Sequence, residues 1–174
     1  MNPQTFLTNI QPLKNKLFRF ASRMLGSVEE AEDVVQEVFI KLWKNKDYLD
    51  QINNLDAWCM TATRNLSIDK LRSKHQKVQP LHPGMDREDR APTPYHTTAN
   101  NDMVEHVRRF MEQLPEKQRQ IMHLRDIEEY TYQEIADALD ISLEQVKVYL
   151  FRARKAVREQ LLRQDAEAFT DRRH

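Results

Sequence analysis

Glycine and cysteine are scarce in this sequence, and each scarcity excludes a class of protein. The 174 residues include two glycines, Gly26 and Gly84, which argues against glycine-rich nucleotide loops and a turn-rich β fold. The single cysteine, Cys59, rules out a disulfide framework within the chain and fits a reducing cytosol. Because no run of about 18 apolar residues is present, we expect no membrane insertion. The N-terminus lacks a basic stretch followed by an apolar run, so we expect no secretory signal and a cytoplasmic protein.

The chain also lacks the residue constellations of an enzyme or a metal protein. Its six histidines show no metal-ligand spacing, and the acidic cluster 29–33 lacks the loop geometry of a calcium site. His106 and His123 are expected at the surface or boundary of helices, and Cys59 as a small core residue rather than a reactive thiol. We therefore expect no enzymatic activity, no metal and no cofactor.

The charges balance over the whole chain but are segregated along it. The formal net charge is zero, with 27 basic and 27 acidic residues. Residues 1–25 carry four basic and no acidic side chains, and residues 26–40 carry five acidic and no basic ones. Residues 64–77 hold five bases against one acid, and residues 146–163 hold six against one. Such blocks create local fields of opposite sign, although solvated helix faces would explain the acidic blocks well.

Proline is concentrated in one stretch, since four of the seven prolines lie between residues 78 and 101. We interpret residues 78–101 as a flexible linker between a domain at 1–77 and a domain at 102–163, with a tail at 164–174. Both domains show helical periodicity and no convincing alternating strand. The sequence therefore predicts an all-α fold of two small helical domains joined by a flexible, proline-containing linker.

Three helices are predicted in the first domain. Apolar residues recur every three or four positions over 5–25, and Ser27 with Glu30 predicts a capping box that opens a second helix, ending near Lys46. A third helix covers 55–77 after a loop. On a helical wheel, its Met60, Ile68 and Leu71 lie nearly opposite an apolar face made of Leu55, Trp58, Cys59, Ala62 and Leu66.

The second helix has an unusual outward face between Ala31 and Trp43. Its apolar stripe, which should face the core, consists of Ala31, Val34, Val35, Val38, Phe39 and Leu42. Ile40 lies on the opposite side, in the middle of Glu29, Asp33, Gln36, Glu37 and Lys44. A branched aliphatic residue among carboxylates and an amide suggests a docking surface, but a solvated acidic face with one exposed isoleucine fits the periodicity equally well.

The second domain ends in a predicted helix-turn-helix. A helix is expected over 103–113, and Pro115 is expected in the first turn of the next one. Thr131 with Glu134 and Ser142 with Gln145 predict two further capping boxes. They delimit helices of about 131–139 and 142–163 separated by a tight turn, which is the helix-turn-helix layout.

The last of these helices has the residue pattern of a DNA-recognition helix. Its apolar stripe is Val146, Leu150, Ala153, Val157 and Leu161. The side chains that project away from this stripe could reach base edges and phosphates, and they are Glu144, Gln145, Lys147, Val148, Arg152 and Lys155. A basic amphipathic helix in an ordinary bundle is the alternative, but caps, turn and charge reversal together favour DNA binding.

The long helix of the first domain indicates a second nucleic-acid contact. Its basic residues follow Trp58 along the helix, and Tyr48 lies in the preceding loop. Aromatic faces beside cations suit unstacked single-stranded bases. Trp58 is nevertheless expected more often in a core than in a stacking platform, and Asn65 could be an ordinary surface amide.

Four stretches in this order resemble the bacterial RNA polymerase sigma factors of the sigma-70 family, in the extracytoplasmic-function group. They are D-V-V-Q-E-V-F-I-K-L-W from Asp33, A-W-C-M-T-A-T-R-N-L-S-I-D-K-L-R from Ala57, L-P-E-K-Q-R-Q-I-M-H-L-R from Leu114 and Y-Q-E-I-A-D-A-L-D-I-S-L-E-Q-V-K-V-Y-L-F-R-A-R-K-A-V from Tyr132. The resemblance covers residues 5–77 and 103–163. It implies a dissociable subunit that binds core RNA polymerase and directs it to promoters.

The resemblance also implies roles for individual residues of the first domain. Asp33, Gln36 and Glu37, with Ile40 between them, would dock on the coiled coil of the largest polymerase subunit. The loop 47–56 and the helix that carries Asn65 would recognise the −10 element and capture a flipped base. The residues implied for this second contact are Tyr48, Trp58, Arg64, Asn65, Arg72 and Lys74.

For the second domain, the resemblance implies that the helix from Ser142 enters the major groove of the −35 element. Lys147, Arg152 and Lys155 would lead a set of contacts that comprises Thr131, Ser142, Glu144, Gln145, Lys147, Val148, Arg152 and Lys155. Members of this group are commonly held inactive by an anti-sigma factor, so the resemblance implies such a partner too. Asp140 stands where the family often has glycine at the turn, and Glu144-Gln145 replaces a commoner small pair, which makes the −35 sequence unpredictable.

Two other functions remain possible on the residues alone. A stand-alone helix-turn-helix regulator explains residues 131–163 equally well, but it leaves the acidic face and the basic long helix unexplained. A helical adaptor that binds only protein predicts no salt-dependent affinity for DNA.

Overall fold

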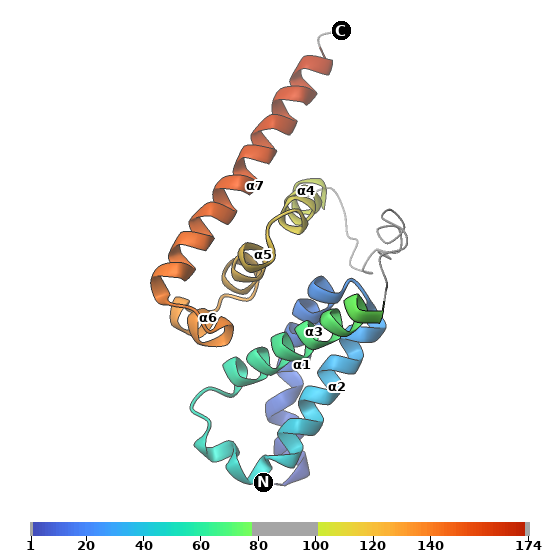
Figure 1. Ribbon diagram of the computed structural model, residues 1–174, viewed down its shortest axis with the longest axis vertical. Coiled ribbons are helices and arrows are strands. Elements are labelled where there is room, and N and C mark those ends of the chain that lie inside the picture. The colour runs from blue at the N-terminus through green and yellow to red at the C-terminus, as the bar shows by residue number, and fades with distance from the viewer. Residues whose placement is uncertain (1, 78–100, 173–174) are drawn as a thin grey trace. The chain divides into compact units, whose positions relative to one another are not determined.

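The computed structural model describes residues 2–77 and 101–172, and every regular element within these ranges is a helix. The chain divides into two compact units, one with α1 to α3 and one with α4 to α7 (Figure 1). The all-α prediction with two helical units is confirmed. Most of the predicted linker lies outside the described residues, and Asn101, its last residue, begins α4. Among the described helices, none has the length and apolarity that a bilayer crossing requires.

The first unit packs three long helices around one core. They are α1 (Pro3–Leu25), α2 (Val28–Lys44) and α3 (Leu55–Lys77), with a 3-10 helix, η1 (Lys46–Gln51), before α3. The first helix begins two residues before the expected position because Asn2 caps it, accepting a hydrogen bond from the Gln4 amide at 3.1 Å. It ends at Gly26, whose φ of +66° belongs to the left-handed region that favours glycine.

The capping box predicted at Ser27 is only half formed. The Ser27 hydroxyl accepts a hydrogen bond from the Glu30 amide at 3.3 Å. The Glu30 carboxylate instead lies 2.8 Å from Lys74 of α3, so a tertiary ion pair holds the side chain that the box requires. The buried stripe of α2 is the predicted one, except that Phe39 is only partly buried and the helix ends at Lys44.

The buried face of α3 differs from the prediction. Met60 is fully buried on the same side as Cys59, whereas the wheel placed the two on nearly opposite faces. This face continues through two small polar residues, Thr63 and Ser67, which are also fully buried. Thr63 tolerates burial because its hydroxyl donates to the Cys59 carbonyl at 2.8 Å, which satisfies the polar group within the helix.

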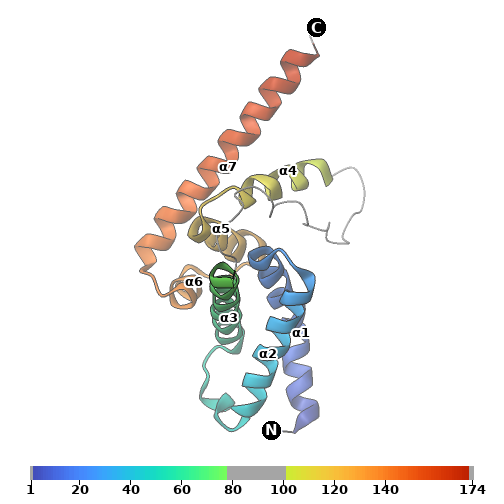
Figure 2. The same cartoon turned by 45° about the vertical axis from the view of Figure 1, so that its right-hand side comes forward.

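The second unit contains two shorter helices and a helix-turn-helix (Figure 2). Its elements are α4 (Asn101–Glu112), α5 (Glu116–Met122), a π-helical turn η2 (His123–Ile127), α6 (Tyr132–Leu139) and α7 (Leu143–Asp171). Pro115 precedes α5 as its N-cap, one residue earlier than expected. His123 is 1% exposed rather than at the surface, because η2 brings its Nε2 atom to 3.3 Å from the equally buried carboxylate of Glu128.

Local hydrogen bonds define the ends of α6 and α7. The Thr131–Glu134 and Ser142–Gln145 capping boxes both form with their reciprocal bonds, as predicted. Asp140 ends α6 with a φ of +53°, so this residue adopts the left-handed conformation in which glycine is commoner. The last helix continues to Asp171, well beyond the predicted end near residue 163, so most of the expected tail is helical.

Candidate nucleic-acid and protein interfaces

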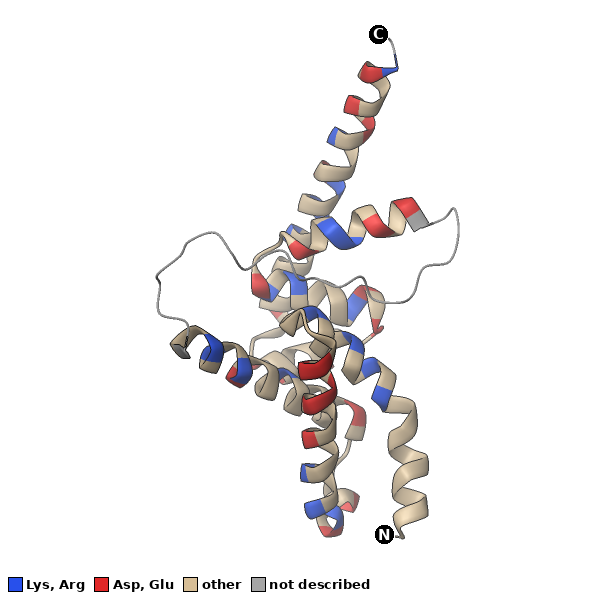
Figure 3. Cartoon of the chain, turned by 90° about the vertical axis from the view of Figure 1, so that its right-hand side faces the viewer, with Lys and Arg blue, Asp and Glu red and all other residues tan. Residues whose placement is uncertain are grey.

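The outward side of α2 has the composition that the sequence predicted. Asp33, Gln36 and Glu37 are all exposed, and Ile40 beside them is 53% exposed. We call these four residues the acidic face. Acidic side chains are grouped along the first half of α2, while basic ones follow the later parts of α1 and α3 (Figure 3). The isoleucine is therefore a solvent-facing residue of the folded unit and not part of its core.

Two ion pairs join the acidic half of α2 to the basic half of α3. The Lys74 ammonium lies 2.8 Å from Glu30, and the Lys70 ammonium lies 3.8 Å from Asp33. Lys74, which the sequence predicted as a phosphate contact, thus already neutralises an acid of its own unit. Asp33 remains two-thirds exposed despite its ion pair, so it stays accessible to another molecule.

The residues predicted for the −10 element lie on η1 and α3, and only some are brought together. Arg64 and Asn65 are neighbours, with Nη1 of the arginine donating to Oδ1 of the amide at 3.3 Å. Asn65 and Arg72 are exposed, and Tyr48 on η1 is 63% exposed. Trp58 is half-buried. Its exposure therefore lies between that of a core residue and that of an exposed stacking platform, the two alternatives that the sequence left open.

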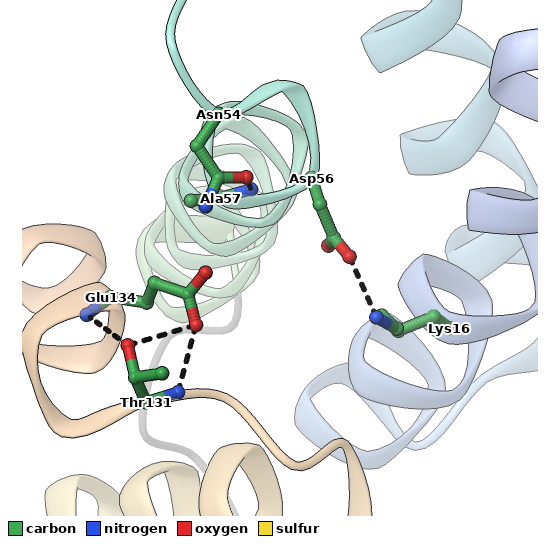
Figure 4. A network of polar contacts seen from close by, with 6 residues as sticks. All are labelled: Lys16, Asn54, Asp56, Ala57, Thr131 and Glu134. Carbon is green, nitrogen blue, oxygen red and sulfur yellow. Dashed lines mark hydrogen bonds and ion pairs between the residues drawn. The ribbon is translucent and has the colours of Figure 1, made fainter.

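The start of α3 is held by two polar contacts of the first unit (Figure 4). The Asn54 side chain accepts a hydrogen bond from the Ala57 amide at 3.0 Å, which caps the helix. Asp56 accepts a hydrogen bond from Lys16 of α1 at 2.7 Å. The first contact fixes the start of α3, and the second ties this end of the helix to α1.

In the second unit, α7 presents the predicted face to solvent. All eight residues predicted for the −35 element are exposed. Val146, Leu150, Ala153 and Val157 are buried, while Leu161 is only partly so. Three of the eight already have a local role, because Thr131, Ser142 and Gln145 take part in the capping boxes, the first of which is drawn in Figure 4.

Sequence reasoning missed a basic cleft beside this face. The cleft has a volume of about 350 Å³ and is lined by Tyr132, Lys147, Leu150, Phe151, Arg154, Lys155 and Arg158. Phe151 is 67% exposed, although it lies within a helix that is mostly charged on its outer side. The helical spacing of Lys147, Phe151, Arg154 and Arg158, which are three or four positions apart, places them on one flank of the helix, and this signal was available in the sequence.

Cys59 belongs to the core and not to an interface. Burial, helped by the negative charge of Asp56, raises the pKa of its thiol to about 12. The thiol therefore stays protonated at neutral pH, and protonated thiols are poor nucleophiles and poor metal ligands. Within the described residues, no group of three or more histidine, cysteine, aspartate or glutamate side chains is arranged to hold a metal ion.

Comparison with known proteins places both units in one family. The Sigma-70 region 2 family matches residues 10–77, and the Sigma-70 region 4 family matches residues 105–157. The ECF RNA polymerase sigma factor SigW of Bacillus subtilis is 29% identical over 164 residues, which cover 85% of this chain and 84% of the relative. SigE of Mycolicibacterium smegmatis is 28% identical, over 88% of this chain and 60% of the relative.

Solved structures share the same fold. The sigma factor RpoE of Bartonella quintana, determined in complex with the anti-sigma factor NepR, matches with a TM-score of 0.71 at 20% identity and covers 91% of this chain and 97% of that one. CnrH, determined with the cytosolic domain of CnrY, matches with a TM-score of 0.64 at 20% identity, over 92% of this chain and 89% of that one. The two family matches occur in the order of the sigma-70 regions and together cover more than two thirds of the sequence. The chain therefore belongs to the sigma-70 family of RNA polymerase sigma factors and, within it, to the extracytoplasmic-function group.

Proposed function

We propose that this sigma factor binds core RNA polymerase through the acidic face of α2 and reads promoter DNA with both units. The observation that supports this most directly is Ile40, an exposed aliphatic side chain surrounded by Asp33, Gln36 and Glu37. An apolar centre with a charged rim is the arrangement of a protein interface. The partner surface would be basic, as expected for the coiled coil of the largest polymerase subunit.

The basic part of α3 and the adjacent η1 would engage the −10 element. Asn65 would bind an unstacked base through its amide, which Arg64 orients by the hydrogen bond to Oδ1. Tyr48 offers an exposed ring on which a second base could stack, and Arg72 an exposed cation for the backbone. Lys74 would act there only in competition with Glu30.

The exposed side of α7 would enter the major groove of the −35 element. Lys147, Val148 and Arg152 lie on the first three turns, where a recognition helix contacts base edges. The capping box at Ser142 fixes the start of this helix, and Lys155 extends the cationic surface toward the phosphates. The proposed functional segments are 1–77 for polymerase and −10 contacts, 78–101 as linker and 102–163 for the −35 element, followed by the tail.

The chain would act in the cytoplasm as a binding subunit with no enzymatic role of its own. An anti-sigma factor is a further expected partner. Both solved structures described above contain a partner protein, and the partner of RpoE is named as an anti-sigma factor. Such a protein would compete with polymerase for one or both units.

Reconstituted transcription tests this proposal. Purified chain is mixed with core polymerase and promoters selected from a randomised DNA library, and both co-elution and run-off transcripts are measured. We expect a stable complex and transcripts that require both promoter elements. DNA binding without any association with polymerase would instead support a stand-alone regulator, and association with polymerase without promoter dependence would support a protein-only adaptor.

A further inference from the structure

Arg154 of α7 is joined to Asp126 of η2 by a two-pronged contact. The guanidinium Nε donates to Oδ2 of the aspartate at 3.0 Å, and Nη2 donates to Oδ1. The two residues are 28 positions apart in the sequence. Planar, bidentate pairs of this kind restrict direction as well as distance. The contact therefore ties the side of α7 to the turn before the helix-turn-helix.

The neighbouring residue of η2 makes a matching contact to the start of α6. Arg125 donates a hydrogen bond from Nη1 to the Tyr130 carbonyl at 2.9 Å. The same guanidinium lies 5.0 Å from the ring centre of Tyr132, in the geometry of a cation–π contact. Consecutive residues of one turn thus hold both helices of the helix-turn-helix.

The buried residues of α6 and α7 combine large and small side chains. Ile135, Leu139, Val146 and Leu150 fill the core, and three alanines, Ala136, Ala138 and Ala153, are buried beside them. Alanines allow close approach but present few side-chain atoms that interlock and oppose sliding or rotation of one helix on another. A directional contact outside the core can therefore adjust the final angle of α7.

Arg154 also lines the basic cleft, together with Lys147, Lys155 and Arg158. It could for that reason be taken as a fourth phosphate contact. Its Nε–Nη2 edge, however, already faces a carboxylate, so a phosphate approaching that edge would meet the negative charge of Asp126. A cation that is neutralised in this way contributes little to counterion release.

We propose that Arg154 is a positioning residue, which with Asp126 sets the direction of α7 so that its outer side chains meet the bases of the −35 element in register. The inference rests on the proposed function of α7. It assigns promoter discrimination, and not phosphate affinity, to this pair. The other cations of the cleft keep the phosphate role.

The test uses holoenzyme assembled from the full chain and core polymerase. Binding is measured at several salt concentrations on a promoter with its intact −35 element and on one with that element scrambled. For Arg154→Gln we expect the ratio of the two affinities to fall about tenfold, comparable to the effect of one mismatched base pair. We expect the slope of log affinity against log salt to stay unchanged, and Asp126→Asn to behave in the same way.

Arg158→Gln is the matched control, since it removes a cation from the same cleft one helical turn away. Loss of a phosphate contact should weaken both promoters alike and lower the salt slope by about one. The exchange Asp126→Arg with Arg154→Asp should restore the affinity ratio, which a defect in folding alone would not predict. Thermal unfolding followed by circular dichroism verifies that each variant is folded at the assay temperature.

A different pattern would overturn the inference. If Arg154→Gln lowers the salt slope by about one and Asp126→Asn tightens binding to both promoters, Arg154 is a phosphate contact that Asp126 partly masks. If the unaltered holoenzyme discriminates the two promoters and Arg154→Gln discriminates them equally well, the positioning role alone is wrong. If the unaltered holoenzyme binds the two promoters equally well, α7 does not read the −35 element, and both the proposed function of α7 and this inference are wrong.

Discussion

The Glu30 carboxylate lies 2.8 Å from the Lys74 ammonium, so that the first turn of α2 is tied to the later part of α3. The contact joins the acidic end of the polymerase-facing helix to a lysine on the helix proposed to bind the −10 element. It also removes Glu30 from the capping box that the local sequence predicts. One carboxylate thereby links the two proposed interfaces of the first unit.

Removing this pair should have a small effect on stability. The Lys74 side chain is about half exposed, so the attraction is screened by water and salt. A double-mutant cycle with Glu30→Ala and Lys74→Ala, measured by urea unfolding at low salt, should give a coupling of about 0.2–1 kcal/mol. The coupling should vanish near 1 M salt. A larger coupling that persists in salt would mean that the pair is effectively buried in solution.

Ile40→Asp should weaken polymerase binding without unfolding the chain. The side chain is already 53% exposed, so the folded unit loses little packing. At an interface, the same change would place an unpaired carboxylate in a desolvated apolar centre, and we expect at least about a tenfold loss of affinity. Titration of the labelled chain with core polymerase measures this affinity.

Leu7→Asp is the matched control for Ile40→Asp. Leu7 is 60% exposed on α1 of the same unit but lies outside the acidic face. We expect it to leave polymerase affinity unchanged. Equal losses for both variants, or no loss for Ile40→Asp, would refute docking through the acidic face.

Asp140→Asn and Asp140→Gly should each stabilise the second unit. Asp140 has a φ of +53° at the C-terminal end of α6, where a negative charge also opposes the helix dipole. We expect the free energy of unfolding to rise by about 0.5–1 kcal/mol. Asp140→Ala should lower the free energy of unfolding by about 1 kcal/mol, because alanine, unlike glycine or asparagine, is strained in the left-handed region. Urea unfolding, followed at the transition of the second unit, shows whether each variant is more or less stable than the natural chain. If Asp140→Ala stabilised the unit, the backbone at this position would not be strained.

The buried thiol of Cys59 should make the first unit less stable in alkali. Its pKa is about 12 in the folded state and 9.0 when unperturbed, so between these values only the unfolded state ionises. The thiol therefore contributes no pH dependence below about pH 9 and a loss of about 1.4 kcal/mol per pH unit above it. The difference in unfolding free energy between the natural chain and Cys59→Ala, measured from pH 8 to 10.5, isolates this effect.

Reaction of Cys59 with a thiol reagent provides an independent check. At pH 8 the folded chain should react far more slowly than the chain in urea, because the thiol is buried and protonated. Rapid reaction of the native chain would contradict the burial of this side chain. So would a difference in unfolding free energy between the natural chain and Cys59→Ala that does not change with pH.

Features that depend on neighbours in sequence were predictable. The two partners of each capping box, at Thr131 and at Ser142, are only three positions apart along the chain. The apolar stripes of α2 and α7 follow directly from the helical repeat. The exposure of Ile40 and of the α7 face follows from the same repeat, because side chains opposite a buried stripe point to solvent. The resemblance to sigma factors rested on these local stretches.

Features that depend on contacts between distant residues were decided by the tertiary structure. The predicted apolar face of α3 did not include Thr63, but a hydrogen bond to the Cys59 carbonyl makes its burial acceptable. Periodicity also gave no hint that His123 would be buried beside Glu128, or that Arg154 would face Asp126. In each case the free energy of a polar side chain depends on the partner that it meets. Helix repeats and caps are properties of consecutive residues, whereas such partners are chosen only when the helices pack.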